Sequence, residues 1–260
     1  MQALNFLVFS NIQSSIFSIK FSMTSVLPPA TARPCIGIIM LDTVFPRLVG
    51  DVGNPKSFPF PVLYETVSGA SPERVVARAD PALLLPFCNA GRRLKAKGAK
   101  ALFTSCGFLA IFQQELVEAL DIPVFSSSLL QIHQARAILS PDQEIGIITA
   151  NSHSLGPQHF AGLGITRPPQ AIVGLQEAEE FPAVFLGNKI TLDSAKVLGE
   201  MRQATRILLQ DYPQVGAVIL ECTNMPPYAW AVQQISGLPV FDVLTMIHYV
   251  LSSINRTIVS

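Results

Sequence analysis

The sequence predicts an α/β fold: two similar parallel-sheet lobes related by a pseudo-two-fold axis, with the active site in the cleft between them. Two observations lead to this prediction. Short apolar runs rich in β-branched residues, typical of buried parallel strands, alternate with amphipathic segments of helical periodicity. The landmarks of the first half then recur in the second half in the same order. With 260 residues, 49% of them hydrophobic, the chain can bury such a core.

The first half is expected to cover residues 34–140 and to carry Cys106. Its strands are predicted from the apolar runs at 35–41, 101–104 and 124–125. Helices are expected at 81–97, at 108–120 and from the serines at 126–128 to about residue 139. We expect the last of these helices to pack on the second lobe.

The second half, residues 141–260, repeats this plan around Cys222. The strand Ile145-Gly146-Ile147-Ile148 reproduces Ile36-Gly37-Ile38-Ile39, and further elements are expected at 217–220, 228–235 and 240–241. Pro123 lies 17 positions after Cys106 and Pro239 lies 17 positions after Cys222, and each proline precedes Val-Phe. The two cysteines therefore occupy equivalent positions in the two halves.

Residues 1–33 are expected to be a disordered extension, with Met23 as the real or alternative start. No apolar run there approaches the ~18 residues of a membrane span, and neither a signal peptide nor a transit peptide pattern is present. The 18 basic and 18 acidic residues balance, which disfavours nucleic acid or an acidic membrane as a partner. We therefore expect a cytoplasmic protein that acts on a small molecule.

Both matched cysteines follow a strand and precede a helix, where ligands of parallel sheets bind. The pseudo-two-fold axis would bring Cys106 and Cys222 face to face. Partial positive charge at helix N-termini stabilises a thiolate and a bound carboxylate, so we expect a pKa near neutrality and a resting pair of one thiolate and one thiol. Such a pair can remove a proton next to a carboxylate and return one from the opposite side. Groups for holding the carboxylate come from Ser105, Gly107, Thr223 and Asn224.

This scheme requires no cofactor and no metal. Cys35 and Cys88 are interpreted as small buried hydrophobic residues. His153 and His159 have no third ligand nearby, and the cysteines lack zinc-site spacing, so no metal site is predicted.

Two motifs carry a resemblance to a known family. Thr-Ser-Cys-Gly at 104–107 and Glu-Cys-Thr-Asn at 221–224 resemble the two cysteine motifs of the aspartate/glutamate racemase superfamily, over about residues 34–253. That superfamily includes cofactor-independent amino-acid racemases, hydantoin racemases, maleate isomerases and arylmalonate decarboxylases. The stretches TSCGFLAIFQ and LECTNMPPYAWAV look like a branch with hydantoin racemases and an algal dimethylsulfoniopropionate lyase. The segment 50–65 resembles a branch-specific loop and strand near the cleft.

The resemblance implies that Cys106 and Cys222 are the two acid/base thiols. It further implies substrate contacts at four polar positions: Asp42, Ser127, Asn151 and Thr223. The chain departs from many aspartate and glutamate racemases at Gly107, where they carry Asn, and at Asn224, where they carry an acidic residue or His. These departures disfavour aspartate and glutamate as substrates.

Three functions remain open at this point. The leading hypothesis is a cofactor-independent racemase or epimerase acting on an amino acid, a related carboxylate or a hydantoin. The alternative is a lyase of the same superfamily, in which one cysteine removes the α-proton and a β-leaving group departs. The third is a non-catalytic protein that binds a small carboxylate. The substrate, its handedness and any homo-oligomer are left open.

Overall fold

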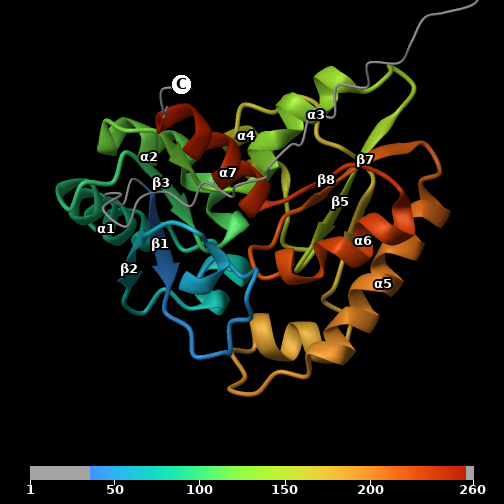
Figure 1. The fold of residues 1–260 in the computed structure, drawn as a ribbon, viewed down its shortest axis with the longest axis horizontal. Coiled ribbons are helices and arrows are strands. Elements are labelled where there is room, and N and C mark those ends of the chain that lie inside the picture. Colours follow the sequence, from blue (N-terminus) through green and yellow to red (C-terminus); the bar gives the residue numbers. More distant parts are fainter. Residues whose placement is uncertain (1–35, 256–260) are drawn as a thin grey trace, which may run out of the picture.

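The computed structural model describes residues 36–255 and contains two four-stranded parallel sheets, each flanked by helices (Figure 1). The first sheet has the order β2-β1-β3-β4 and the second the order β6-β5-β7-β8. The predicted two-lobed α/β fold is thus confirmed, because the second half repeats the strand order of the first. The strands are β1 (Ile36–Leu41), β2 (Val62–Val67), β3 (Ala101–Thr104), β4 (Val124–Phe125), β5 (Glu144–Thr149), β6 (Ile172–Gly174), β7 (Val215–Leu220) and β8 (Val240–Phe241).

The helices lie between the strands, as parallel connections require. Short 3-10 or π helices precede several of them and turn the chain out of a strand end. The first half has η1 (Pro55–Ser57), η2 (Glu73–Ala77), η3 (Pro81–Leu83), α1 (Leu84–Ala96), η4 (Gly107–Phe112), α2 (Gln113–Leu120), η5 (Ser128–Gln131) and α3 (Ile132–Ile138). The second half has α4 (Pro157–Gly162), η6 (Pro182–Leu186), α5 (Ser194–Asp211), η7 (Pro226–Tyr228), α6 (Ala229–Ser236) and α7 (Val243–Ile254).

The interior strands explain the apolar runs of the sequence. Every residue of β1, β3 and β7 is buried, because helices cover both faces of each sheet. One hydrophobic cluster extends from the first lobe into the second and includes Ile39, Leu102, Ile148 and Leu220. Cys88 on α1 belongs to this cluster. The two lobes therefore share a continuous core.

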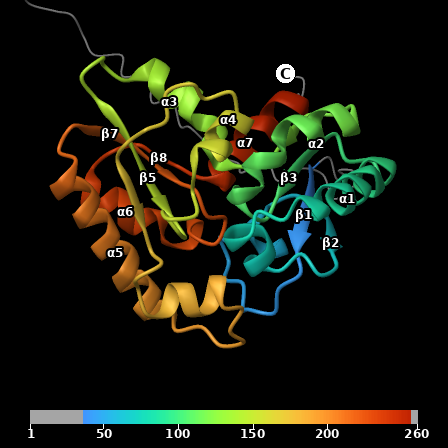
Figure 2. The same cartoon turned by 180° about the vertical axis from the view of Figure 1, so that it is seen from behind.

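The lobes also exchange helices, which is visible from both sides of the molecule (Figures 1 and 2). Helix α7, from the second half, packs Met246 and Ile247 against Ile38 and Phe103 of the first sheet. In the other direction η5 and α3 of the first half pack against β7 and β5, and Ser128 Oγ donates a hydrogen bond of 2.7 Å to the carbonyl of Leu220. This exchange holds the carboxyl ends of the two sheets opposite each other.

Some elements were not predicted. The 18-residue helix α5, which begins where Asp193 accepts hydrogen bonds from the backbone N–H groups of Ala195 and Lys196, escaped the sequence reading. The same is true of the three-residue strand β6. The helix predicted at 108–120 begins as the 3-10 turn η4, a common winding at helix starts.

The predicted N-terminal extension at 1–33, with Met23, lies outside the described residues, as does Cys35. Within residues 36–255, no helix combines the length and the apolar composition that crossing a bilayer requires.

Candidate active site

The matched cysteines lie at equivalent places in the two lobes. Cys106 follows the interior strand β3 and is the N-cap of η4, whereas Cys222 follows the interior strand β7 and precedes η7. Each sulfur accepts a backbone N–H from the residue two positions later, Phe108 in one case and Asn224 in the other. The repeat that the spacing indicated is therefore also a repeat of local geometry.

Both cysteines line one cavity between the lobes, whose free volume for water-sized molecules is about 20 Å³. That volume is about what one water molecule needs, so the walls would have to move apart to admit a larger ligand. The other polar side chains in its wall are those of Thr43, Arg47, Ser105, Glu221 and Asn224. The apolar part of the wall includes the aromatic rings of Phe45, Phe108 and Phe185. The cavity wall thus carries both polar and aromatic side chains.

The thiols are held protonated in this state. Burial raises the pKa of Cys106 and of Cys222, and the negative charge of Glu221 raises both further. The N–H groups of Phe108 and Asn224 act in the opposite direction. Our expectation of a thiol pKa near neutrality is wrong, because desolvation outweighs the helix N-terminus.

Glu221 is a site residue that the sequence reading missed. Its side chain is 0% exposed, and Thr149 Oγ1 donates to its Oε2 at 2.8 Å. The backbone N–H of Ala150 also donates to this carboxyl group, whereas Oε1 has no hydrogen-bond partner among the described residues. Burial raises the pKa of Glu221 to about 7. A glutamate directly after the apolar run VGAVIL was the available signal, since acidic residues are rarely buried without a reason.

Gly107 fits closely against Glu221. A Cβ atom at position 107 would lie 2.2 Å from Glu221 Oε1 and 2.5 Å from the Glu221 carbonyl oxygen. The glycine itself is buried beside the cavity. The residue that departs from the racemase motif at 107 is therefore matched to the glutamate before the second cysteine.

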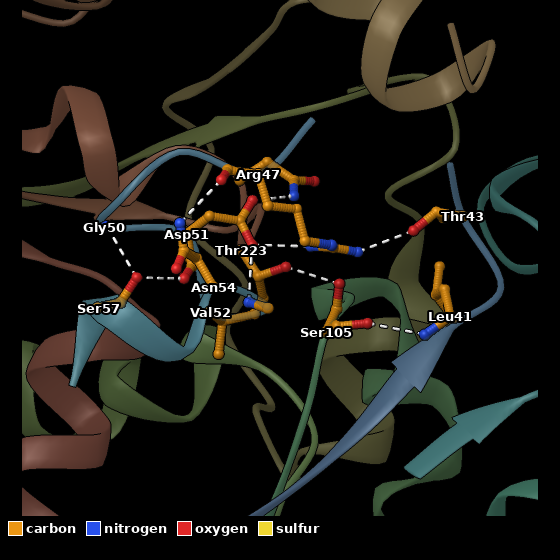
Figure 3. Close-up of polar contacts among 12 residues, drawn as sticks. Leu41, Thr43, Arg47, Gly50, Asp51, Val52, Asn54, Ser57, Ser105 and Thr223 are labelled. Carbon is orange, nitrogen blue, oxygen red and sulfur yellow. Dashed lines mark hydrogen bonds and ion pairs between the residues drawn. The ribbon is translucent and has the colours of Figure 1, made fainter. Parts of the chain in front are cut away.

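A buried polar network ties the loop after β1 to the second cysteine motif. Asp51 is 1% exposed and accepts from Arg47 Nη1 at 2.7 Å and from Asn224 Nδ2 at 2.6 Å. Figure 3 shows the Arg47 guanidinium between Asp51 and Thr43, whose Oγ1 accepts from Nη2 at 2.9 Å. The network fixes a cation in the cavity wall. Sequence reasoning missed both Arg47 and Asp51, although Asp51 lies in the segment 50–65 that resembled a branch-specific loop.

Thr223 and Ser105 join the two cysteine motifs directly. Thr223 Oγ1 donates to the carbonyl of Ser105 at 2.6 Å, and Ser105 Oγ accepts from the N–H of Leu41 at 2.8 Å (Figure 3). Ser105 lines the cavity beside Asn224, whose Oδ1 accepts from Cys222 Sγ at 3.4 Å. The structure thus gathers the residues of both cysteine motifs at one place.

Five residues proposed as substrate contacts do not line this cavity: Gly107 and Thr223, described above, and Asp42, Asn151 and Ser127. Asp42 is exposed and accepts from the N–H of Gly69 at 2.9 Å. Asn151 accepts from two backbone N–H groups that follow it, and Ser127 caps η5. Their contact with substrate stays a prediction. Among the residues from 36 to 255, no group of three or more His, Cys, Asp or Glu side chains is placed to hold a metal ion.

The sequence of this chain was compared with models of protein families. Residues 62–247 match the model described as Asp/Glu/Hydantoin racemase. The chain belongs to this family. The predicted resemblance is thereby confirmed.

The curated proteins to which this chain is similar carry a different activity in their names. The chain is 33% identical over 223 residues to "Dimethylsulfoniopropionate lyase" of Durusdinium sp. clade D, covering 83% of this chain and 73% of that protein. It is 31% identical over 260 residues to "Dimethylsulfoniopropionate lyase 5" of Emiliania huxleyi (strain CCMP1516), covering 94% of this chain but 50% of that protein. The chain therefore spans only half the length of this second relative.

Solved structures confirm the fold at low sequence identity. Glutamate racemase from Aquifex pyrophilus has a TM-score of 0.53 at 16% identity, covering 85% of this chain and 84% of that chain. Unliganded arylmalonate decarboxylase has a TM-score of 0.51, also at 16% identity, covering 80% of this chain and 86% of that chain. Racemases and a decarboxylase thus share the two-lobed architecture.

Proposed function

We propose that this chain is a lyase that cleaves dimethylsulfoniopropionate, or a close relative of it, into dimethyl sulfide and acrylate. The observation that carries the proposal is the identity of 33% and 31% to two proteins named as dimethylsulfoniopropionate lyases. The leading hypothesis from the sequence, a racemase, therefore takes second place, and the lyase alternative becomes first.

The reaction needs one base within the cavity. The thiolate of Cys106 or Cys222 takes the proton on the carbon next to the carboxylate, so a C–H bond breaks and an S–H bond forms. The released electron pair forms the C=C bond of acrylate, and the C–S bond breaks with its pair leaving on dimethyl sulfide. The proton then passes to solvent, which regenerates the base. One thiol suffices, and the second is free to donate a hydrogen bond.

The wall of the cavity supports a substrate with a carboxylate at one end and a sulfonium at the other. Arg47, held by Asp51, offers its guanidinium to the carboxylate, an arrangement that arginine geometry favours. The rings of Phe108 and Phe185 offer aromatic surface to the sulfonium, as aromatic cages do for other onium ligands. The two ends of the substrate would therefore contact different side chains of the wall.

A racemase or epimerase remains the second candidate, on a specific observation. Two cysteines at equivalent strand ends line the same cavity, and removal and return of a proton on opposite faces of a carbon needs two such groups. A lyase does not need this symmetry.

The two candidates separate in heavy water. The purified protein is incubated with dimethylsulfoniopropionate, and dimethyl sulfide and acrylate are measured by gas and liquid chromatography. A parallel panel of amino acids and hydantoins is screened by mass spectrometry for deuterium in the recovered compound. We expect equal amounts of dimethyl sulfide and acrylate, and a loss of at least ~100-fold in Cys106→Ser or Cys222→Ser, whichever supplies the base.

Cys88→Ala is the matched control, because Cys88 is buried in α1 and does not line the cavity. It should keep the parent activity. Deuterium incorporation into a recovered amino acid or hydantoin, with no dimethyl sulfide from the sulfonium compound, would replace the lyase by the racemase.

A further inference from the structure

Glu221 has a hydrogen-bonding capacity that the protein does not use. Both of its protein contacts, Thr149 Oγ1 and the N–H of Ala150, donate to the carboxyl group. Thr149 Oγ1 donates to Oε2, whereas Oε1 is buried without a partner among the described residues. A protonated Glu221 would therefore carry its hydrogen on Oε1, as a hydrogen-bond donor without an acceptor among the described residues. Glu221 lines the cavity, where a ligand or an ordered water can satisfy such an atom.

The surroundings favour this acid form when a carboxylate arrives. Burial already raises the pKa of Glu221 to about 7, and a second negative charge in the same cavity would raise it further. The titratable groups around Glu221 are the thiols of Cys106 and Cys222. The guanidinium of Arg47 also lies in the cavity wall, and Asp51 pairs with it from behind the wall. Both thiols become easier to ionise when Glu221 is neutral, because its negative charge raises the pKa of each.

We propose that Glu221 binds substrate as a neutral carboxylic acid, donating a hydrogen bond from Oε1 to the substrate carboxylate. This role rests on the proposed function only in that the substrate has a carboxylate next to the reacting carbon. As the α-proton leaves, negative charge builds on the carboxylate oxygens, and a donor fixed in a water-poor site stabilises that charge. Arg47 would supply the positive charge, and Glu221 the donor that itself adds no charge.

The close fit of Gly107 is part of this arrangement. Because a Cβ at 107 would meet both Oε1 and the backbone carbonyl of Glu221, the glycine leaves room for the carboxyl group beside the cavity. Replacing Glu221 by Gln tests the role without changing its shape. The amide oxygen of Gln can accept from Thr149 and Ala150, while its NH₂ group takes the place of Oε1 and donates.

Isothermal titration calorimetry with propionate and with acrylate measures the linkage directly. Titrations of the intact protein at several pH values, in buffers of different ionisation enthalpy, report the number of protons taken up per ligand. For the parent protein we expect close to one proton at pH 8 and an affinity that falls up to tenfold per pH unit above about 7. For Glu221→Gln we expect no proton uptake and an affinity independent of pH over this range.

Glu118→Gln is the matched control, since Glu118 is exposed on α2, and it should behave as the parent. The kinetic readout is a KM for the sulfonium substrate that rises above pH 7 in the parent and stays level in Glu221→Gln. Dimethyl sulfide release combined with proton-independent carboxylate binding would overturn the role of Glu221 and leave the lyase standing. Proton uptake on carboxylate binding without release of dimethyl sulfide would overturn the proposed lyase activity. It would leave the role of Glu221 in place for a different carboxylate substrate. The role also falls if Glu221→Gln takes up a proton as the parent does, or if neither carboxylate binds.

Discussion

Gly107→Ala tests the packing that holds the two cysteine motifs together. The added Cβ would lie 2.2 Å from Glu221 Oε1 and 2.5 Å from the Glu221 carbonyl oxygen. The carboxyl group could rotate away, but the carbonyl belongs to the backbone directly after β7, so η4 and this backbone must separate. An ordinary contact of about 3.4 Å requires a shift of roughly 0.9 Å, and overpacking of this kind costs about 1–3 kcal/mol. A displacement of about 1 Å at the site also lowers turnover by up to ~100-fold.

Urea unfolding followed by circular dichroism measures the first effect, and dimethyl sulfide release the second. The expected result is a loss of about 2 kcal/mol in the free energy of unfolding, with an activity loss larger than the fraction unfolded explains. Gly199→Ala is the control, because no atom lies within 4 Å of its Cβ position and Gly199 sits inside α5. That variant should gain about 0.5–1 kcal/mol from helix propensity. A Gly107→Ala protein with parent stability and parent turnover would refute the reasoning.

Other consequences concern the buried charges. Asp51→Asn should lose about 3 kcal/mol of unfolding free energy, because it leaves Arg47 without its buried partner. The control Glu179→Gln, in the exposed ion pair with Lys196, should change the unfolding free energy by less than ~0.5 kcal/mol. Equal effects of the two substitutions in urea unfolding would contradict this. The pKa of Glu221 is raised from 4.5 to about 7 in the folded protein, so the free energy of unfolding falls as pH rises through this window. The unfolding free energy of Glu221→Gln should therefore match that of the parent near pH 4.5 and exceed it by about 3 kcal/mol at pH 8. A difference that does not change with pH would rule out this titration. Iodoacetamide labelling of Cys106 and Cys222, read by mass spectrometry in the ligand-free protein, should keep increasing above pH 9 because both thiol pKa values are raised; half-maximal labelling near pH 7 would contradict the burial argument.

The order of the elements was readable because the interior strands are buried on both faces. Such strands need uninterrupted apolar residues, and β1, β3 and β7 are therefore visible as runs of them. The helix α5 has no comparable signal, since charged residues occupy its exposed side and its start depends on the Asp193 cap. The three-residue strand β6 is too short for any periodicity to show.

Some residues of the site could likewise be predicted from local sequence, whereas others depend on contacts between distant parts of the chain. Cys106 and Cys222 follow apolar strands at equal distances from Pro-Val-Phe, so their equivalence could be predicted from spacing alone. Arg47 and Asp51 stand in a loop whose path over the second lobe depends on Asn224, which is 173 residues beyond Asp51. No local pattern carries that information.

The sequence by itself determined the two-lobed α/β plan and the matched cysteines, because strand burial, helix periodicity and the internal repeat are local properties of the chain. Only the tertiary structure decided the electrostatics of the site. The pKa of each thiol depends on how much water the opposing lobe excludes and on the placement of Glu221, and both arise where the carboxyl ends of the two sheets meet. Desolvation is a property of the assembled cavity, and it reversed the protonation expected from the helix N-termini alone.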